Sequence, residues 1–183
     1  MKFFRSILLA ISLVSIPLTA IDKQAHIEGK FFSKLSDYRF FKDLTNQIPA
    51  DEVLPYQLQS ELFSDYTYKQ RFVYVPPAMK VGHEKNKVFM FPVGSVLIKT
   101  FSYQNTMSEL TPQLLETRLL IHSEGGWKAV SYIWNEDQTE AYLSLVGGTI
   151  QTSFSDEGGN IRSVRYRAPN KNQCKECHQI NAS

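Results

Sequence analysis

The chain has 183 residues, a formal net charge of +2 with its histidines neutral, and 13% aromatic residues. This length suffices for one domain with a sizeable core, and the near balance of charges argues against a nucleic-acid partner. Twelve phenylalanines and nine tyrosines favour a β-rich domain, because aromatic side chains suit the half-buried surface of a pleated sheet.

Residues 1–20 have the pattern of a secretory signal peptide, for which we expect cleavage after Ala20. Lys2 and Arg5 give a positive start, and residues 7–16 form an apolar stretch that is too short to cross a bilayer comfortably. An uncleaved N-terminal anchor is the alternative. After cleavage, the chain is expected to be an exported protein that is not integral to a membrane.

Residues 21–69 are predicted to form a short helix followed by an extended arm. Ser36 or Asp37 suits the N-cap of a helix that runs to Leu44. The stretch from residue 48 to residue 68 contains prolines and irregularly spaced apolar residues, so we expect it to pack on the domain as an arm.

Residues 70–168 carry the signals of an antiparallel β meander, because β-branched and aromatic runs alternate with Gly, Pro and Asn turn signals. The predicted strands lie at residues 71–75, 87–91, 95–103, 114–122, 127–134, 141–146, 149–154 and 161–167, and the fourth run is also compatible with a helical start. The sequence therefore predicts a mostly β fold. It would be a single antiparallel domain, a sandwich or a curved barrel-like sheet, with a short N-terminal helix and a C-terminal segment, residues 169–183.

Both cysteines of the chain lie in one pentapeptide of that segment, residues 174–178 (CKECH). Two thiols three positions apart, followed directly by histidine, match the attachment site of c-type haem. In such a site Cys174 and Cys177 add across the two haem vinyl groups, and His178 supplies an axial nitrogen to the iron. Since bacteria attach c-type haem outside the inner membrane, the signal peptide supports this interpretation and predicts a periplasmic location.

Three other interpretations of the pentapeptide stay open, namely a zinc site, a redox-active disulfide and an unused haem motif. Zinc would need a fourth ligand from His26, His83 or His122, none of which has paired ligand spacing. A redox-active CxxC usually opens a helix in a βαβ unit, whereas only five residues follow His178. A structural disulfide is disfavoured, because a bridge within the pentapeptide closes almost no loop.

Six further runs of the sequence bear on its family: residues 63–66 (FSDY), 71–77 (RFVYVPP), 91–101 (FPVGSVLIKTF), 115–122 (LETRLLIH), 134–139 (WNEDQT) and 169–174 (PNKNQC). With these runs the chain resembles, from about residue 35 to residue 178, the N-terminal part of a bacterial family of di-haem c-type cytochromes found in Shewanella and related genera. Members of that family continue to a second CxxCH motif. The resemblance therefore implies a short or truncated member that carries one covalent haem c.

The turn at residues 91–94 (FPVG) before a strand, combined with a CxxCH near the C-terminus, supports a weaker likeness. This combination of a turn, a strand and a late CxxCH is similar to the arrangement in the lysine-crosslinked haem cytochromes of ammonia oxidisers and in the β-sheet cytochromes c′. By this likeness Lys99 falls at the position of the crosslinking lysine and is a candidate haem contact. A strand lysine that faces solvent is the ordinary alternative.

The sixth iron position has several candidate ligands, of which we single out His122, at the end of a predicted strand. The others are Met79, Met90, Met107, His26 and His83, and an open sixth site is equally compatible with the sequence. Met90 is expected to fill the core and His83 to be exposed. Glu116 and Arg118 are predicted to share one face of a strand, and no residue is assigned a catalytic role.

The sequence thus predicts a periplasmic c-type cytochrome that exchanges single electrons with redox partner proteins of the cell envelope. A second hypothesis is a haem enzyme or gas-binding protein with an open iron site. A third is a non-catalytic β-domain protein from a truncated gene, in which the haem motif is unused.

Overall fold

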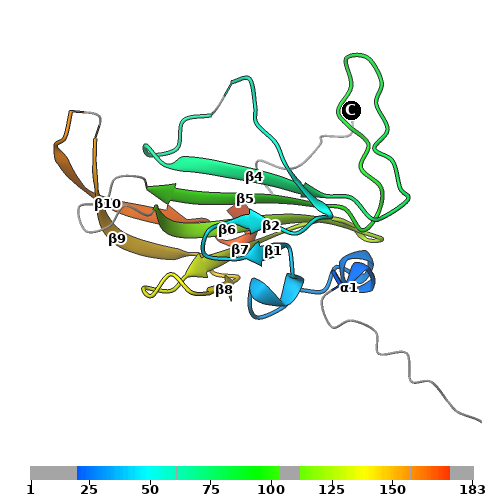
Figure 1. Ribbon diagram of the computed structural model, residues 1–183, viewed down its shortest axis with the longest axis horizontal. Coiled ribbons are helices and arrows are strands. Elements are labelled where there is room, and N and C mark those ends of the chain that lie inside the picture. The colour runs from blue at the N-terminus through cyan, green and yellow to red at the C-terminus, as the bar shows by residue number, and fades with distance from the viewer. Residues whose placement is uncertain (1–19, 61, 104–111, 157, 174–183) are drawn as a thin grey trace, which may run out of the picture.

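The protein is described from a computed structural model that covers residues 20–60, 62–103, 112–156 and 158–173. Six antiparallel strands form its central sheet in the order β3-β4-β5-β6-β7-β8 (Figure 1). They are β3 (Val53–Pro55), β4 (Tyr68–Tyr74), β5 (Val96–Tyr103), β6 (Gln113–Ser123), β7 (Gly126–Trp134) and β8 (Ala141–Ser144). Each strand pairs with its neighbour in the chain, which confirms the mostly β, antiparallel fold predicted from the sequence.

The N-terminal segment covers one face of this sheet, which we call the N-terminal face. It comprises α1 (Lys23–Glu28), the 3₁₀ helix η1 (Ser36–Tyr38) and the paired strands β1 (Phe41–Asp43) and β2 (Ile48–Pro49). Apolar side chains from this segment and from the sheet form one buried core, which includes Leu35, Tyr38, Phe40, Phe72, Ile98, Leu119, Ile121 and Tyr132.

The hairpin of β9 (Gly148–Ser155) and β10 (Ile161–Ala168) packs on part of the opposite face, the C-terminal face. A second core lies between hairpin and sheet, where the Tyr103 and Phe154 rings stack with centroids 4.5 Å apart. In Figure 1 the tip of the hairpin (orange) extends beyond one end of the sheet, whereas α1 and the segment between β4 and β5 (green) lie at the other end.

A β-bulge interrupts the pairing of β5 with β6. Phe101 is paired with Glu116 and the next residue, Ser102, with Leu114, so that Leu115 is the extra residue. Leu114 consequently belongs to the first core and Leu115 to the second, while Glu116 also points to the C-terminal face. The predicted alternative of a helical start for this run is wrong, because β6 is a strand throughout.

Three other predictions about local structure are wrong. The helix expected from Ser36 or Asp37 to Leu44 is only the three-residue η1, because Arg39 takes a positive φ of 58° and the chain then enters β1. The helix that does form is α1, capped by the Asp22 side chain and ended by Gly29 in the left-handed conformation.

The strand predicted at residues 87–91 is absent from the described structure. Residues 75–95 form a long connection in which one isolated bridge joins Gly82 to Met90. Met90 is 52% exposed, so the prediction that it fills the core is wrong as well. Its neighbours in this connection cannot bury it, because they lie outside the sheet.

In the described residues, no helix is long and apolar enough to span a membrane. Of the predicted signal peptide, residues 1–19 lie outside the described part of the chain, and Ala20 is exposed.

Candidate functional site

The predicted haem-attachment residues Cys174, Cys177 and His178 lie outside the described residues, which end at Gln173. The segment that leads to them is described. The backbone N–H of Lys171 donates to the Leu145 carbonyl at 3.1 Å, directly after the end of β8. This hydrogen bond holds Lys171 beside the end of β8. The last residue of β8, Ser144, pairs with Ser131 of β7 on the C-terminal face, so Lys171 lies near the edge of that face.

The local sequence accounts for this course of the chain. The Asn170 side-chain oxygen accepts hydrogen bonds from the backbone N–H groups of Asn172 and Gln173, both at 3.0 Å. These bonds cap the helical backbone of residues 171–173. Asn170 is therefore the point where the chain turns away from β10 toward residues 171–173.

Cross-strand registers divide the C-terminal face into rows, because directly paired residues of antiparallel strands point to the same side. One row is apolar and crosses four strands: Val73 pairs with Leu97, Leu97 with Leu120, and Leu120 with Ala129. All four side chains are half-buried. We call this set the apolar row. It is a partly solvent-accessible hydrophobic surface beside the hairpin.

The adjacent row is basic. Arg71 pairs with Lys99 and Lys99 with Arg118, and Lys69 lies one alternate position further along β4. We call these four residues the basic row. The Lys99 ammonium lies 4.8 Å and the Arg118 guanidinium 4.3 Å from the centre of the Phe101 ring. Each of the four cations interacts with other groups of the protein. Lys99 is half-buried on this face, not a fully solvent-facing strand lysine.

Glu116 lies at the border between the basic row and the hairpin, and its side chain is fully buried. Arg118 binds it with two hydrogen bonds, Nε to Oε1 at 2.8 Å and Nη2 to Oε2 at 2.9 Å. The Tyr166 hydroxyl of β10 donates to Glu116 Oε2 at 2.6 Å. Burial, and next the charge of Glu116, raise the pKa of Tyr166, so this hydroxyl keeps its proton. The structure confirms that Glu116 and Arg118 share a face.

On the other side of the apolar row, His122 pairs with Trp127, and the two rings are stacked with centroids 4.5 Å apart. The Nδ1 atom of His122 lies 2.8 Å from the Phe91 carbonyl oxygen. Because a carbonyl oxygen only accepts, Nδ1 carries a proton, and in the neutral imidazole Nε2 is then the nitrogen with the lone pair. Iron- and zinc-ligating histidines commonly have this arrangement, in which the other ring nitrogen donates to a backbone carbonyl.

The remaining candidates for the sixth iron position lie elsewhere. Met79 and Met90 are exposed in the connection between β4 and β5, as is His83, whose exposure the sequence predicted. His26 is buried beneath the N-terminal face, and Met107 lies outside the described residues. Among the described candidates, His122 is therefore the one on the C-terminal face, together with Lys99.

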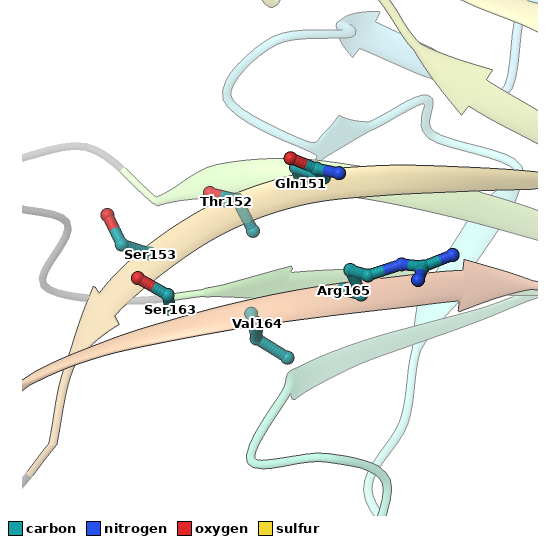
Figure 2. A pocket seen from close by; sticks show the side chains of 6 residues that line it. All are labelled: Gln151, Thr152, Ser153, Ser163, Val164 and Arg165. Atoms are coloured by element: carbon teal, nitrogen blue, oxygen red, sulfur yellow. The ribbon is translucent and has the colours of Figure 1, made fainter.

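The described residues offer little else that resembles an active site. Within them, no group of three or more His, Cys, Asp and Glu side chains could hold a metal ion. A hollow of about 450 Å³ lies along the β9–β10 hairpin, and Figure 2 shows that it is lined by paired residues of the two strands, Gln151, Thr152, Ser153, Ser163, Val164 and Arg165. It is shallow, and its lining is that of an exposed two-stranded ribbon. Comparison with protein-family models, curated proteins and solved structures found no match.

Proposed function

We propose that the protein is a periplasmic c-type cytochrome that carries one covalent haem and transfers single electrons. The observation that carries this proposal is the pentapeptide CKECH, which begins directly after Gln173. When bound, the haem supplies a one-electron iron couple, while the protein supplies ligands, burial and orientation.

The chemistry of the C-terminal face supports this proposal. A haem needs an apolar surface for its macrocycle, cations for its propionate carboxylates and a nitrogen or sulfur ligand for its iron. The apolar row would contact the macrocycle, Lys99 and Arg118 would bind the carboxylates, and His122 would offer Nε2 to the iron. Arg118 and His122 are four positions apart on β6, with Leu120 of the apolar row between them on the same face. Four residues of a strand span about 13 Å, so the proposed carboxylate and iron contacts are separated by about that distance.

The reach of the chain is compatible with this location. His178 follows Gln173 by five positions, and five residues of fully extended chain span at most about 17 Å. The segment before the pentapeptide is held by the Leu145 carbonyl, which accepts the hydrogen bond from Lys171. Leu145 follows Ser144 of β8, and Ser144 pairs with Ser131 of β7. Ser131 in turn pairs with Arg118 of β6. Lys171, three positions before the pentapeptide, therefore lies beside the edge of the proposed haem surface. A second histidine ligand generally gives a lower haem potential than methionine does, so the proposed cytochrome would be a low-potential carrier.

The test is covalent haem attachment in a bacterial host that exports the protein and attaches c-type haem. We expect the wild-type band to stain for haem after denaturing electrophoresis. The variant Cys174→Ser/Cys177→Ser should lose the stain and keep a cooperative thermal transition, which shows that the β domain still folds. A wild-type protein without covalent haem overturns the proposal. In that case zinc analysis and a thiol titration of the same sample separate a zinc site from a disulfide.

A further inference from the structure

The connection between β4 and β5 projects beyond the end of the sheet (Figure 1, green). Backbone hydrogen bonds stabilise it in two places, within the connection itself and between it and β6. Gly82 and Met90 exchange two backbone hydrogen bonds of 2.9 Å, and the Gly94 N–H donates to the carbonyl of His122 at 2.6 Å. The projection is therefore a hydrogen-bonded feature of the fold that is anchored next to the proposed iron ligand.

The surface of this projection combines exposed apolar and basic side chains. Met79, Val88, Phe89 and Met90 are exposed by 49%, 70%, 59% and 52%. Three exposed lysines accompany them, Lys80, Lys85 and Lys87, against the single acidic residue Glu84, which pairs with Lys87. Single exposed apolar residues are ordinary on a protein surface, but several together with a charged rim are typical of an interaction site. We call residues 79–90 the docking loop.

A series of ring contacts joins the docking loop to the C-terminal face. Phe89 lies 6.4 Å from Phe91, Phe91 lies 6.1 Å from Trp127, and Trp127 stacks on His122 at 4.5 Å, all between ring centroids. The exposed ring of Phe89 is thus connected by successive ring contacts to the histidine that we propose as an iron ligand.

We infer that the docking loop is the contact surface for a redox partner protein that presents acidic side chains around an apolar patch. This inference rests on the proposed function. One electron passes between the ferrous protein and the oxidised partner across the ring series, and no bond or proton has to move. Charge complementarity selects an acidic partner, because three lysines against one acidic residue leave the docking loop with a net positive charge. An anionic membrane surface would match the lysines too, but it would make no use of the ring series.

The first experiment does not require haem. Poly-L-glutamate is titrated into isotopically labelled protein, and amide shifts are followed by NMR. We expect shifts confined to the docking loop, and their loss in the variant K80Q/K85Q/K87Q. A control variant with the same charge change, K34Q/R165Q/R167Q, removes exposed cations of β10 and of the β8 edge and should behave like the wild type. Shifts spread over other basic surfaces, or equal loss in both variants, overturn the inference.

The second experiment uses the haem-loaded protein. Ferrous protein is mixed with hexacyanoferrate(III), which takes up one electron and becomes hexacyanoferrate(II). At low ionic strength we expect the K80Q/K85Q/K87Q variant to react about tenfold more slowly than the K34Q/R165Q/R167Q control, with the difference vanishing at high salt. Equal rates overturn the inference even where haem is attached. Sedimentation with phosphatidylglycerol vesicles in the absence of any poly-L-glutamate response would identify a membrane-binding loop and equally overturn it.

Discussion

The imidazole of His122 lies flat on the indole of Trp127, with the two ring planes 10° apart. The hydrogen bond from His122 Nδ1 to the Phe91 carbonyl fixes the same ring from a second direction. Stacking sets the orientation of the ring, and the hydrogen bond sets its tautomer. Together they hold Nε2 in the form in which histidine binds a metal ion.

We therefore predict that His122→Ala changes the coordination of the haem iron. The haem-loaded wild type should show a low-spin absorption spectrum in both oxidation states, because in the proposed cytochrome two histidines would ligate the iron. The variant should become high-spin and bind carbon monoxide in its ferrous form, since the sixth position opens. Absorption spectra with and without carbon monoxide measure both effects.

The matched control for this prediction is His83→Ala, which removes an exposed histidine of the docking loop. It should leave the spectrum of the haem unchanged. A wild type that is already high-spin and binds carbon monoxide would contradict ligation by His122 and would favour the gas-binding alternative.

His26 provides a second prediction, about stability and pH. Its ring is fully buried, with Tyr38, Phe40 and Tyr74 rings at 5.8, 5.3 and 5.4 Å. Burial lowers the pKa of His26 from 6.5 to about 4, and the charge of Asp22 and the backbone of Gly94 offset this only in part. Between these two pH values the unfolded chain binds the proton and the folded chain does not, so acidification favours unfolding.

The free energy of unfolding should accordingly fall by roughly 3 kcal/mol through this one group as the pH drops from 7 to 4. Urea-induced unfolding of the wild type and of His26→Phe at several pH values tests this. The phenylalanine suits the aromatic surroundings and does not titrate, so the variant should lose less stability on acidification. The same loss in both proteins would show that His26 has no part in it.

The sequence predicted most of the strands, because β-branched and aromatic residues are dense in β5, β7 and β10. It missed α1, since six residues are too few for a helical period to stand out. The strand predicted at residues 87–91 failed for a different reason. Its β-forming residues lie outside the sheet as the exposed part of the docking loop, so strand propensity was overridden by the tertiary context.

The candidate site could be predicted only in part. His122 and Lys99 were chosen from the sequence, but their common face depends on the register between β5 and β6. That register contains the bulge at Leu115, which no local pattern indicates. The apolar row likewise joins Val73 to Ala129 through three pairings. Each strand shows its own run of β-forming residues in the sequence, whereas the turns and tertiary packing determine how strands align.

A third prediction concerns the bond between the hairpin and the sheet. Tyr166→Phe removes the hydroxyl that donates to the buried Glu116 carboxylate, while Arg118 remains to bind it. Hydrogen bonds to charged groups contribute about 1.5–3 kcal/mol, so we expect a loss in that range in the free energy of unfolding by urea. Tyr142→Phe is the control, because Tyr142 is exposed and should tolerate the change. Equal stability of the two variants would contradict a role for Tyr166 in fixing the hairpin.

The turn at Gly147 supports a fourth prediction, which connects the fold to haem attachment. Gly147 has a positive φ of 74°, and a Cβ added there would lie 2.5 Å from the Ala168 carbonyl oxygen and 2.9 Å from the Asn170 nitrogen. Both neighbours are backbone atoms of the segment that leads to the pentapeptide. Gly147→Ala must therefore displace that segment, whereas Gly126→Ala has a similar positive φ of 88° and nothing within 4 Å.

Both alanine variants should lose about 1–2 kcal/mol to the left-handed backbone conformation, and Gly147→Ala should lose more because of the backbone contact. Only Gly147→Ala should also lower the yield of covalent haem, since it shifts residues 168–170, which precede the attachment site in the chain. Urea-induced unfolding measures the first effect, and haem content per folded protein measures the second. If Gly126→Ala lowers the haem yield to the same extent, the loss reflects general stability, and the close contact at Gly147 has no separate role in presenting Cys174 and Cys177.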